Sequence, residues 1–245
     1  MRLPDRGAVV RALPSWLVDK VPRDHREPDA VFRRRRKVVA GVSVLGAGLL
    51  GASLSTRPGS TEFYALTAAV AGTWVTGGFA SGPLHLGWMQ ARDETLRRPV
   101  LTPVLTGVAA FGVFYGCALV VREVPLLERA VSSVLTYASG GSTPLVLLTT
   151  LANGAAEEVF FRGALYAAVG EAHPVLVSTA VYALATVATR NPALVLAAGA
   201  MGGLLGAQRR ASGGIQAPVL THLTWSTLML RYLPPVFART GPRTR

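Results

Sequence analysis

The chain has little charge along most of its length. Only 16% of its 245 residues are charged, 50% are hydrophobic, and the mean hydropathy is +0.38. Stretches of roughly 18 or more residues pass without a charge, whereas a soluble domain alternates apolar and polar faces. This composition excludes an ordinary soluble core and predicts an integral membrane protein.

Cysteine is almost absent. The single cysteine, Cys117, excludes an intrachain disulfide and a zinc cluster built on cysteines. Acidic residues are also few, since 13 Asp and Glu stand against 25 Lys and Arg and leave a net charge of +12. This imbalance raises the question of where the basic residues lie.

Much of the basic charge lies in residues 1–37, which end in the run RRRRK at 33–37. The run directly precedes an apolar segment, so the positive-inside rule and anionic lipid headgroups explain it better than nucleic acid does. We therefore expect membrane lipids as partners and no nucleic acid. The expected location is the cytoplasmic (plasma) membrane, with the N-terminus in the cytoplasm.

Apolar runs predict an all-α polytopic bundle of about seven transmembrane helices. The stretch 123–137 is typical of an amphipathic helix at the membrane interface. Seven spans would leave the basic tail 236–245 outside, against the positive-inside rule, so a re-entrant or further span stays open. The expected spans are 38–56, 63–81, 100–121, 143–170, 175–189, 192–208 and 214–233.

The chain divides into four predicted parts. A basic cytoplasmic segment, 1–37, precedes the N-terminal membrane helices and interfacial segment, 38–142. A core at 143–235 contains the charged motif described next, and the basic tail 236–245 follows it.

The motif NGAAEEVFFRG, residues 153–163, places three charges in an otherwise apolar helix. Glu158 and Arg162 are four residues apart with the acid first, the favoured order for an intrahelical ion pair. Glu157 lies about 100° around the helix from Glu158 and has no basic residue placed to neutralise it locally. An unpaired carboxylate in a membrane indicates a functional site. The alternative is a closed charged network that only stabilises the bundle.

The sequence EEVFFRG resembles the EExxxR signature of the CPBP family (CAAX protease and bacteriocin-processing, also called Abi) of intramembrane proteases, which includes the type II CAAX prenyl proteases. The residues that follow are similar to that family's core in order and spacing. They comprise a helix with an FxxxH-like motif, an apolar Gly-rich helix, and an HxxxN-like helix whose beginning is GGIQAPVLTHLTWS. The resemblance covers roughly residues 143–235. It implies an endopeptidase that cleaves a peptide or membrane-protein substrate inside the membrane.

The resemblance also implies roles for individual residues. Glu157 corresponds to the glutamate that activates the attacking water, Glu158 and Arg162 to its supporting pair, and His222 to the histidine of the final motif. The implied site is a polar cavity between the helices that carry Glu157, Thr186 and His222.

Two positions depart from the family pattern. Thr186 stands where the family usually has histidine, and Ser226 stands where asparagine is usual. His222 and Ser226, one turn apart, could both donate to an oxyanion. A catalytic zinc site usually needs three protein ligands, so two glutamates and His222 would have to supply all of them. We therefore favour a glutamate-activated water without zinc, and the metal stays open.

Two other functions remain open. A catalytically degenerate member could bind a membrane partner or peptide as a scaffold without cutting it, which the departures at Thr186 and Ser226 favour. A carrier of small molecules or ions is suggested by the buried charge, but the chain has no convincing internal repeat. Among the other histidines, His85 is expected at the membrane interface and His173 in a loop.

Overall fold

The computed structural model describes residues 28–91 and 94–238, and this part of the chain is all-α apart from one small hairpin. The prediction that the chain is all-α is therefore confirmed. Residues 1–27 and 239–245, with His25 and most of the basic tail, lie outside the described residues. The elements are α3 Asp29–Ser53, α4 Thr61–Ala80, β1 Met89–Gln90, β2 Leu96–Arg97, α5 Leu101–Val121, α6 Pro125–Ser139, α7 Thr143–Glu157, the π-helix η1 Glu158–Leu165, α8 Tyr166–Val169, α9 Pro174–Val187, α10 Pro192–Ser212, α11 Gln216–Tyr232 and α12 Pro234–Phe237.

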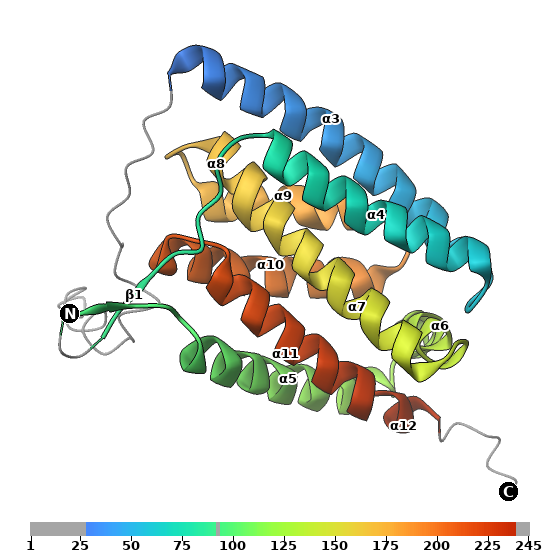
Figure 1. Cartoon of the computed structure of the whole chain (residues 1–245). Coiled ribbons are helices and arrows are strands. Elements are labelled where there is room, and N and C mark those ends of the chain that lie inside the picture. The colour runs from blue at the N-terminus through green and yellow to red at the C-terminus, as the bar shows by residue number, and fades with distance from the viewer. Residues whose placement is uncertain (1–27, 92–93, 239–245) are drawn as a thin grey trace, which may run out of the picture.

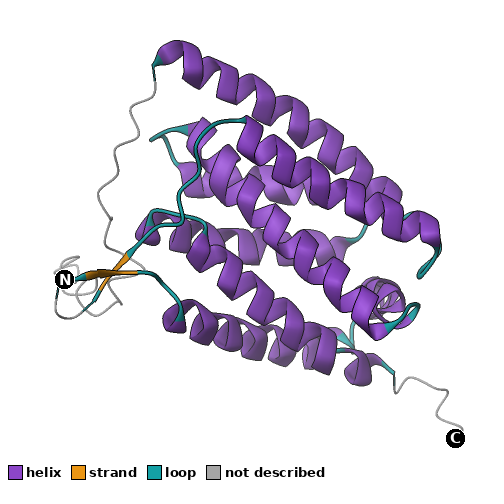
Figure 2. Cartoon of the chain, viewed as in Figure 1, coloured by secondary structure: helices purple, strands orange, loops and turns teal. Residues whose placement is uncertain are grey.

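The long helices lie side by side along one common direction (Figure 1). Helix α3 packs on α4, α4 on α7, α7 on α11, and α11 on α5, while α9 and α10 pair with each other behind them. The hairpin, α8 and the start of α11 lie at one end of the bundle, and α6, α12 and the turn between α3 and α4 lie at the other (Figure 1). Figure 2 shows that the loops gather at these two ends. Helix α7 and η1 are thus surrounded by other helices.

Helix α3 begins at Asp29, earlier than the predicted start of the first span at residue 38. The arginine run therefore forms the first turns of the helix and does not precede it, since arginine is a good helix former and Asp29 complements the helix dipole. Arg35 is only 2% exposed. Its guanidinium donates to Ser81 Oγ at 3.2 Å and to the Pro83 carbonyl at 3.4 Å, which ties the start of α3 to the loop after α4.

The predicted helix 143–170 is continuous, but it changes type at the charged motif. Helix α7 ends at Glu157, residues Glu158–Leu165 form a π-helix, and α8 ends at Val169, where the following Gly170 has a positive φ of 78°. Wider π turns of this kind frequently mark functional sites. Nothing in the apolar periodicity predicted this change.

The motif helix is anchored by aromatic packing. The Trp74 ring lies 4.6 Å from the Phe160 ring centroid and 5.0 Å from that of Phe161, and all three side chains are at most 1% exposed. Trp74 is therefore a packing residue. Its indole also lies against Gly46 of α3. Helices α3, α4 and η1 thus share one core.

Two helices of the described chain are long and apolar enough to cross a membrane, α3 and α5, and α9 is a shorter apolar helix. The expected number of seven spans is therefore not established by length and hydropathy. Large apolar side chains are nevertheless exposed on several helices, among them Val44 (77%), Leu101 (70%) and Leu184 (70%). An outer surface of this kind is typical of a protein that contacts lipid.

The turn before α11 is docked on the loop that follows α4. The Ile215 amide donates to the His85 carbonyl at 2.8 Å, and the Trp88 amide donates to the Ser212 carbonyl at 2.7 Å. Gly87 and Gly214 meet so closely that a Cβ on Gly214 would lie 2.1 Å from the Gly87 nitrogen. This contact fixes the start of the helix that carries His222.

The contact between α3 and α4 yields a stability prediction. A Cβ added at Gly46 would lie 2.2 Å from the Trp74 ring, whereas a Cβ at Gly48 of the same helix would meet nothing within 4 Å. We expect Gly46→Ala to lower the free energy of unfolding by about 1 to 3 kcal/mol, the usual cost of overpacking. Thermal unfolding in detergent checks this against Gly48→Ala, and equal melting temperatures for the two variants would contradict the packing described.

Candidate active site

Glu158 is the most enclosed charged residue of the motif. It is 0% exposed, and its Oε1 accepts a hydrogen bond from Arg162 Nη1 at 3.1 Å, which confirms the ion pair expected from their spacing. The same oxygen lies 2.8 Å from His222 Nδ1. One carboxylate oxygen therefore joins η1 to α11, a link that the sequence did not predict.

The orientation of His222 follows from this contact. Because a carboxylate only accepts hydrogen bonds, Nδ1 is the protonated ring nitrogen and Nε2 is left for other chemistry. Gly154 of α7 lies beside that edge of the ring, where an added Cβ would be 3.5 Å from Nε2. The glycine thus lets the imidazole lie directly against α7.

Glu157 has a partner that the sequence analysis missed. Tyr182 of α9 donates from Oη to Glu157 Oε2 at 2.6 Å. The Tyr182 ring also lies under the Arg162 guanidinium, with 4.6 Å between the guanidinium carbon and the ring centroid. The sequence held one signal for this contact: Tyr182 is one helical turn before Thr186, so both side chains lie on the same face of α9.

The two adjacent glutamates therefore differ in environment. Glu157 is half-buried, whereas Glu158 is fully buried and contacts both Arg162 and His222. Glu158 Oε2 and Arg162 Nη2 are buried and have no hydrogen-bond partner among the described groups. Glu157 is thus the more accessible acid, and Glu158 is an internal anchor.

The charges of this cluster nearly cancel. Two carboxylates and one guanidinium leave one negative charge, which a proton on His222 or on Glu157 removes. Because net charge is costly in a low-dielectric interior, the cluster favours holding one such proton. With the proton on His222, Glu157 is a carboxylate able to accept a proton.

Thr186 and Ser226, the two departures from the family motifs, are 6% and 7% exposed. The Thr186 hydroxyl donates to the Tyr182 carbonyl at 2.8 Å, so it is used within its own helix. Within residues 28–91 and 94–238, no hydrogen bond joins either side chain to the charged cluster. Glu158 contacts Arg162 and His222 directly, and Tyr182 connects Glu157 to Arg162. Thr186 and Ser226 take no part in these side-chain contacts.

The residues of the cluster do not supply a zinc site. Among the described residues, no three His, Cys, Asp or Glu side chains converge in an arrangement that could hold a metal ion. Glu158 Oε1 is already shared by Arg162 and His222, and a catalytic zinc usually needs three protein ligands. No step is therefore assigned to a metal. Of the other histidines, His173 precedes α9 in the left-handed conformation, with φ 53°.

Arg209 supports the motif from α10. It is 2% exposed, donates from Nε to the Arg162 carbonyl at 2.5 Å, and lies with its guanidinium 4.9 Å from the centroid of the Tyr166 ring. The predicted span 192–208 ends before the two arginines of the run QRR (208–210), which α10 includes. Only Arg210 of its two arginines is exposed, whereas Arg209 holds the motif helix.

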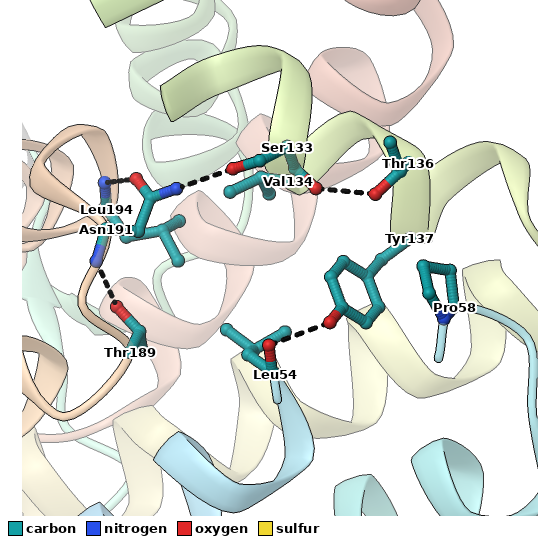
Figure 3. Close-up of a pocket in the computed structure, with 9 residues that line it drawn as sticks. All are labelled: Leu54, Pro58, Ser133, Val134, Thr136, Tyr137, Thr189, Asn191 and Leu194. Atoms are coloured by element: carbon teal, nitrogen blue, oxygen red, sulfur yellow. Dashed lines mark hydrogen bonds between the residues drawn. The ribbon is translucent and has the colours of Figure 1, made fainter. Parts of the chain in front are cut away.

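A separate cavity of about 260 Å³ lies near the other end of the bundle (Figure 3). Tyr137 at its edge donates to the Leu54 carbonyl at 2.7 Å and to the Thr56 carbonyl at 2.8 Å. None of the predicted site residues lines this cavity, so it is distinct from the polar cavity expected around Glu157. Its lining residues are Leu54, Pro58, Ser133, Val134, Thr136, Tyr137, Thr189, Asn191 and Leu194.

Comparison with known proteins gives a match at the level of a family. Residues 139–228 match the family model described as "Type II CAAX prenyl endopeptidase Rce1-like". No curated protein and no solved structure matches the chain significantly. The matched segment contains every residue of the charged cluster, and it agrees with the resemblance that the motif EEVFFRG indicated.

The shared carboxylate predicts the effect of removing one partner. Arg162→Ala leaves Glu158 buried without its guanidinium, which costs roughly 3 to 5 kcal/mol, so we expect less folded protein and a lower melting temperature. Detergent-extracted yield and thermal unfolding measure this, with Arg210→Ala as the matched exposed control. Wild-type yield and melting temperature for Arg162→Ala would show that the pair is not needed for folding.

Proposed function

We propose that this chain, whose residues 139–228 match the family of type II CAAX prenyl endopeptidases, is an intramembrane endopeptidase that hydrolyses peptide bonds with water activated by Glu157. The substrate class is a peptide or membrane protein. The observation that carries the proposal is the different setting of the paired glutamates: Glu157 is half-buried, and Glu158 is enclosed by Arg162 and His222.

Glu157 is the general base of the proposed reaction. Tyr182 occupies its Oε2, so Oε1 accepts a proton from water while the water oxygen adds to the carbonyl carbon of the scissile peptide bond. The tetrahedral intermediate then breaks its C–N bond, and the proton held by Glu157 passes to the leaving nitrogen. The products are a carboxylic acid and an amine, and Glu157 returns to its carboxylate form.

His222 stabilises the oxyanion in this scheme. Glu158 holds Nδ1, so a protonated imidazole directs its Nε2–H away from Glu158. Donors already fixed in place stabilise developing charge without reorganising, which is why such groups contribute strongly to catalysis. Ser226, one turn further along α11, is the second proposed donor. Arg162 holds the Glu158 carboxylate in place, and the Thr186 hydroxyl donates to the carbonyl of Tyr182.

The orientation in the membrane is part of the proposal. The start of α3, the hairpin and the end of α10 lie at one end of the bundle (Figure 1), and they carry the arginine run, Arg98 and Arg210. We infer that this end faces the cytoplasm and anionic lipid headgroups across the cytoplasmic membrane. About seven helices then cross the bilayer, with the N-terminus inside.

A second candidate function is a binding protein that has lost catalysis. The hydroxyl of Thr186 bonds within its own helix, and among the residues that the structure describes no hydrogen bond joins Ser226 to the charged cluster, so two family motif positions contribute nothing to it directly. Such a protein would hold a membrane partner or peptide without cutting it. The next two experiments separate this scaffold from the enzyme.

Replacement of the proposed base gives the first test. Glu157→Gln keeps the shape of the side chain and removes its ability to accept a proton, so cleavage of a membrane-peptide library should fall by at least ~100-fold. The protein should still fold, as judged by its melting temperature. Glu123→Gln, at an exposed glutamate, is the matched control. Equal cleavage by wild type and Glu157→Gln would rule out this base, and a lack of cleavage by wild type would favour the binding protein.

Restoring the family's usual residue gives the second test. Thr186→His places a base or a metal ligand at the matching position, so cleavage or metal content should rise above that of the wild type. Thr189→His, near the same end of α9 but lining the separate cavity, is the control. The measurement combines peptide cleavage, with and without chelator, and elemental analysis. No change in either quantity would mean that position 186 is not part of the site.

A further inference from the structure

Glu157 and Tyr182 form the shortest hydrogen bond between side chains of the charged cluster. The Tyr182 hydroxyl donates to Glu157 Oε2 at 2.6 Å, a length typical of an O–H donor bound to a carboxylate. The bond joins α7 to α9, two helices that are separate in the sequence. Nothing in the motif spacing assigns this hydroxyl a role.

The Tyr182 ring is held so that its hydroxyl has little freedom. It is 9% exposed, its centroid lies 4.6 Å from that of Phe161, and the Arg162 guanidinium covers one face at 4.6 Å. Arg162 is in turn fixed by Glu158. The hydroxyl is therefore a preorganised donor, since its position is set by packing and by a second hydrogen-bonded pair.

We propose that Tyr182 is the positioning residue of the base. Its hydroxyl binds one oxygen of Glu157, turns the other oxygen toward water, and keeps the carboxylate charged in apolar surroundings. This assignment rests on the proposed function of Glu157, but the hydrogen bond itself can be tested without cleavage. It also gives α9 a contribution to the site although Thr186 bonds only to its own helix.

The alternative for Tyr182 is a structural link between α7 and α9. Tyr137 offers a comparison, because its half-buried hydroxyl shares its proton between the Leu54 and Thr56 carbonyls, far from the charged cluster. Loss of either hydroxyl removes hydrogen bonds and lowers stability. Only loss of the Tyr182 hydroxyl changes how readily Glu157 takes up a proton, because hydrogen bonds to a carboxylate favour its charged form.

The test compares Tyr182→Phe with Tyr137→Phe by labelling with dicyclohexylcarbodiimide, which adds to protonated carboxyl groups in membranes. Modification of Glu157 is followed by mass spectrometry over a range of pH in the full-length protein. We expect Tyr182→Phe to label about tenfold faster than wild type or more, the effect of losing one hydrogen bond to a charged group. Tyr137→Phe should label at the wild-type rate.

A graded variant covers the case in which Tyr182→Phe folds poorly. A ring-fluorinated tyrosine at position 182 keeps the shape and makes the hydroxyl a stronger donor, so labelling of Glu157 should be slower than in wild type. If the chain cleaves peptide, the acid limb of kcat/KM against pH should also move to higher pH in Tyr182→Phe, with little change in KM.

The outcomes separate this inference from the proposed function. Faster labelling of Glu157 in Tyr182→Phe supports the positioning role even if no variant cleaves peptide. A lack of cleavage would overturn the proposed protease function, but it would not affect the conclusion about the hydrogen bond. Unchanged labelling in both position-182 variants overturns the positioning role, whether or not the wild type is active. A shift of equal size in Tyr137→Phe would also overturn it, because the effect would then be a general loss of packing.

Discussion

One oxygen of Glu158 organises the centre of this protein. It accepts from Arg162 on its own helix and from His222 on α11, and all three side chains are nearly or fully excluded from solvent. Removing Arg162 would leave a buried charge unbalanced, and removing His222 would take away the contact with α11, so the positions of η1 and α11 depend on the same atom. The docking of the turn at Gly214 on the loop at Gly87 then sets where α11 begins.

The change from α-helix to π-helix lies next to this oxygen. Glu157 is the last residue of α7 and Glu158 is the first of η1, so the half-buried and the enclosed glutamate belong to different helix types. Arg209 binds the Arg162 carbonyl, and Trp74 stacks on Phe160, which holds the wider turns from two sides. Packing and a buried guanidinium thus stabilise a backbone form that apolar sequence alone does not favour.

The sequence predicted the elements well where a local pattern determines them. The helix over 143–170 and the ion pair of Glu158 with Arg162 follow from apolar length and i,i+4 spacing, and both are present. The hydrogen bonds from His222 to Glu158 and from Tyr182 to Glu157 join residues 64 and 25 positions apart, so no local pattern could predict them. The predicted first span starts at residue 38, nine residues after the start of α3 at Asp29. The charged arginines indicated a boundary in the sequence, whereas in the structure they continue the helix. The number of spans stays a prediction.

The central claim is that water activated by Glu157 attacks a peptide bond directly. It is tested most directly by a single turnover of a membrane peptide with the purified wild-type protein in water enriched in heavy oxygen, followed by mass spectrometry of the product and of the protein. The account predicts one heavy oxygen atom in the new product carboxylate and none in Glu157. Heavy oxygen in the Glu157 side chain would indicate a covalent intermediate and contradict the base role, and an uncut peptide would contradict the protease.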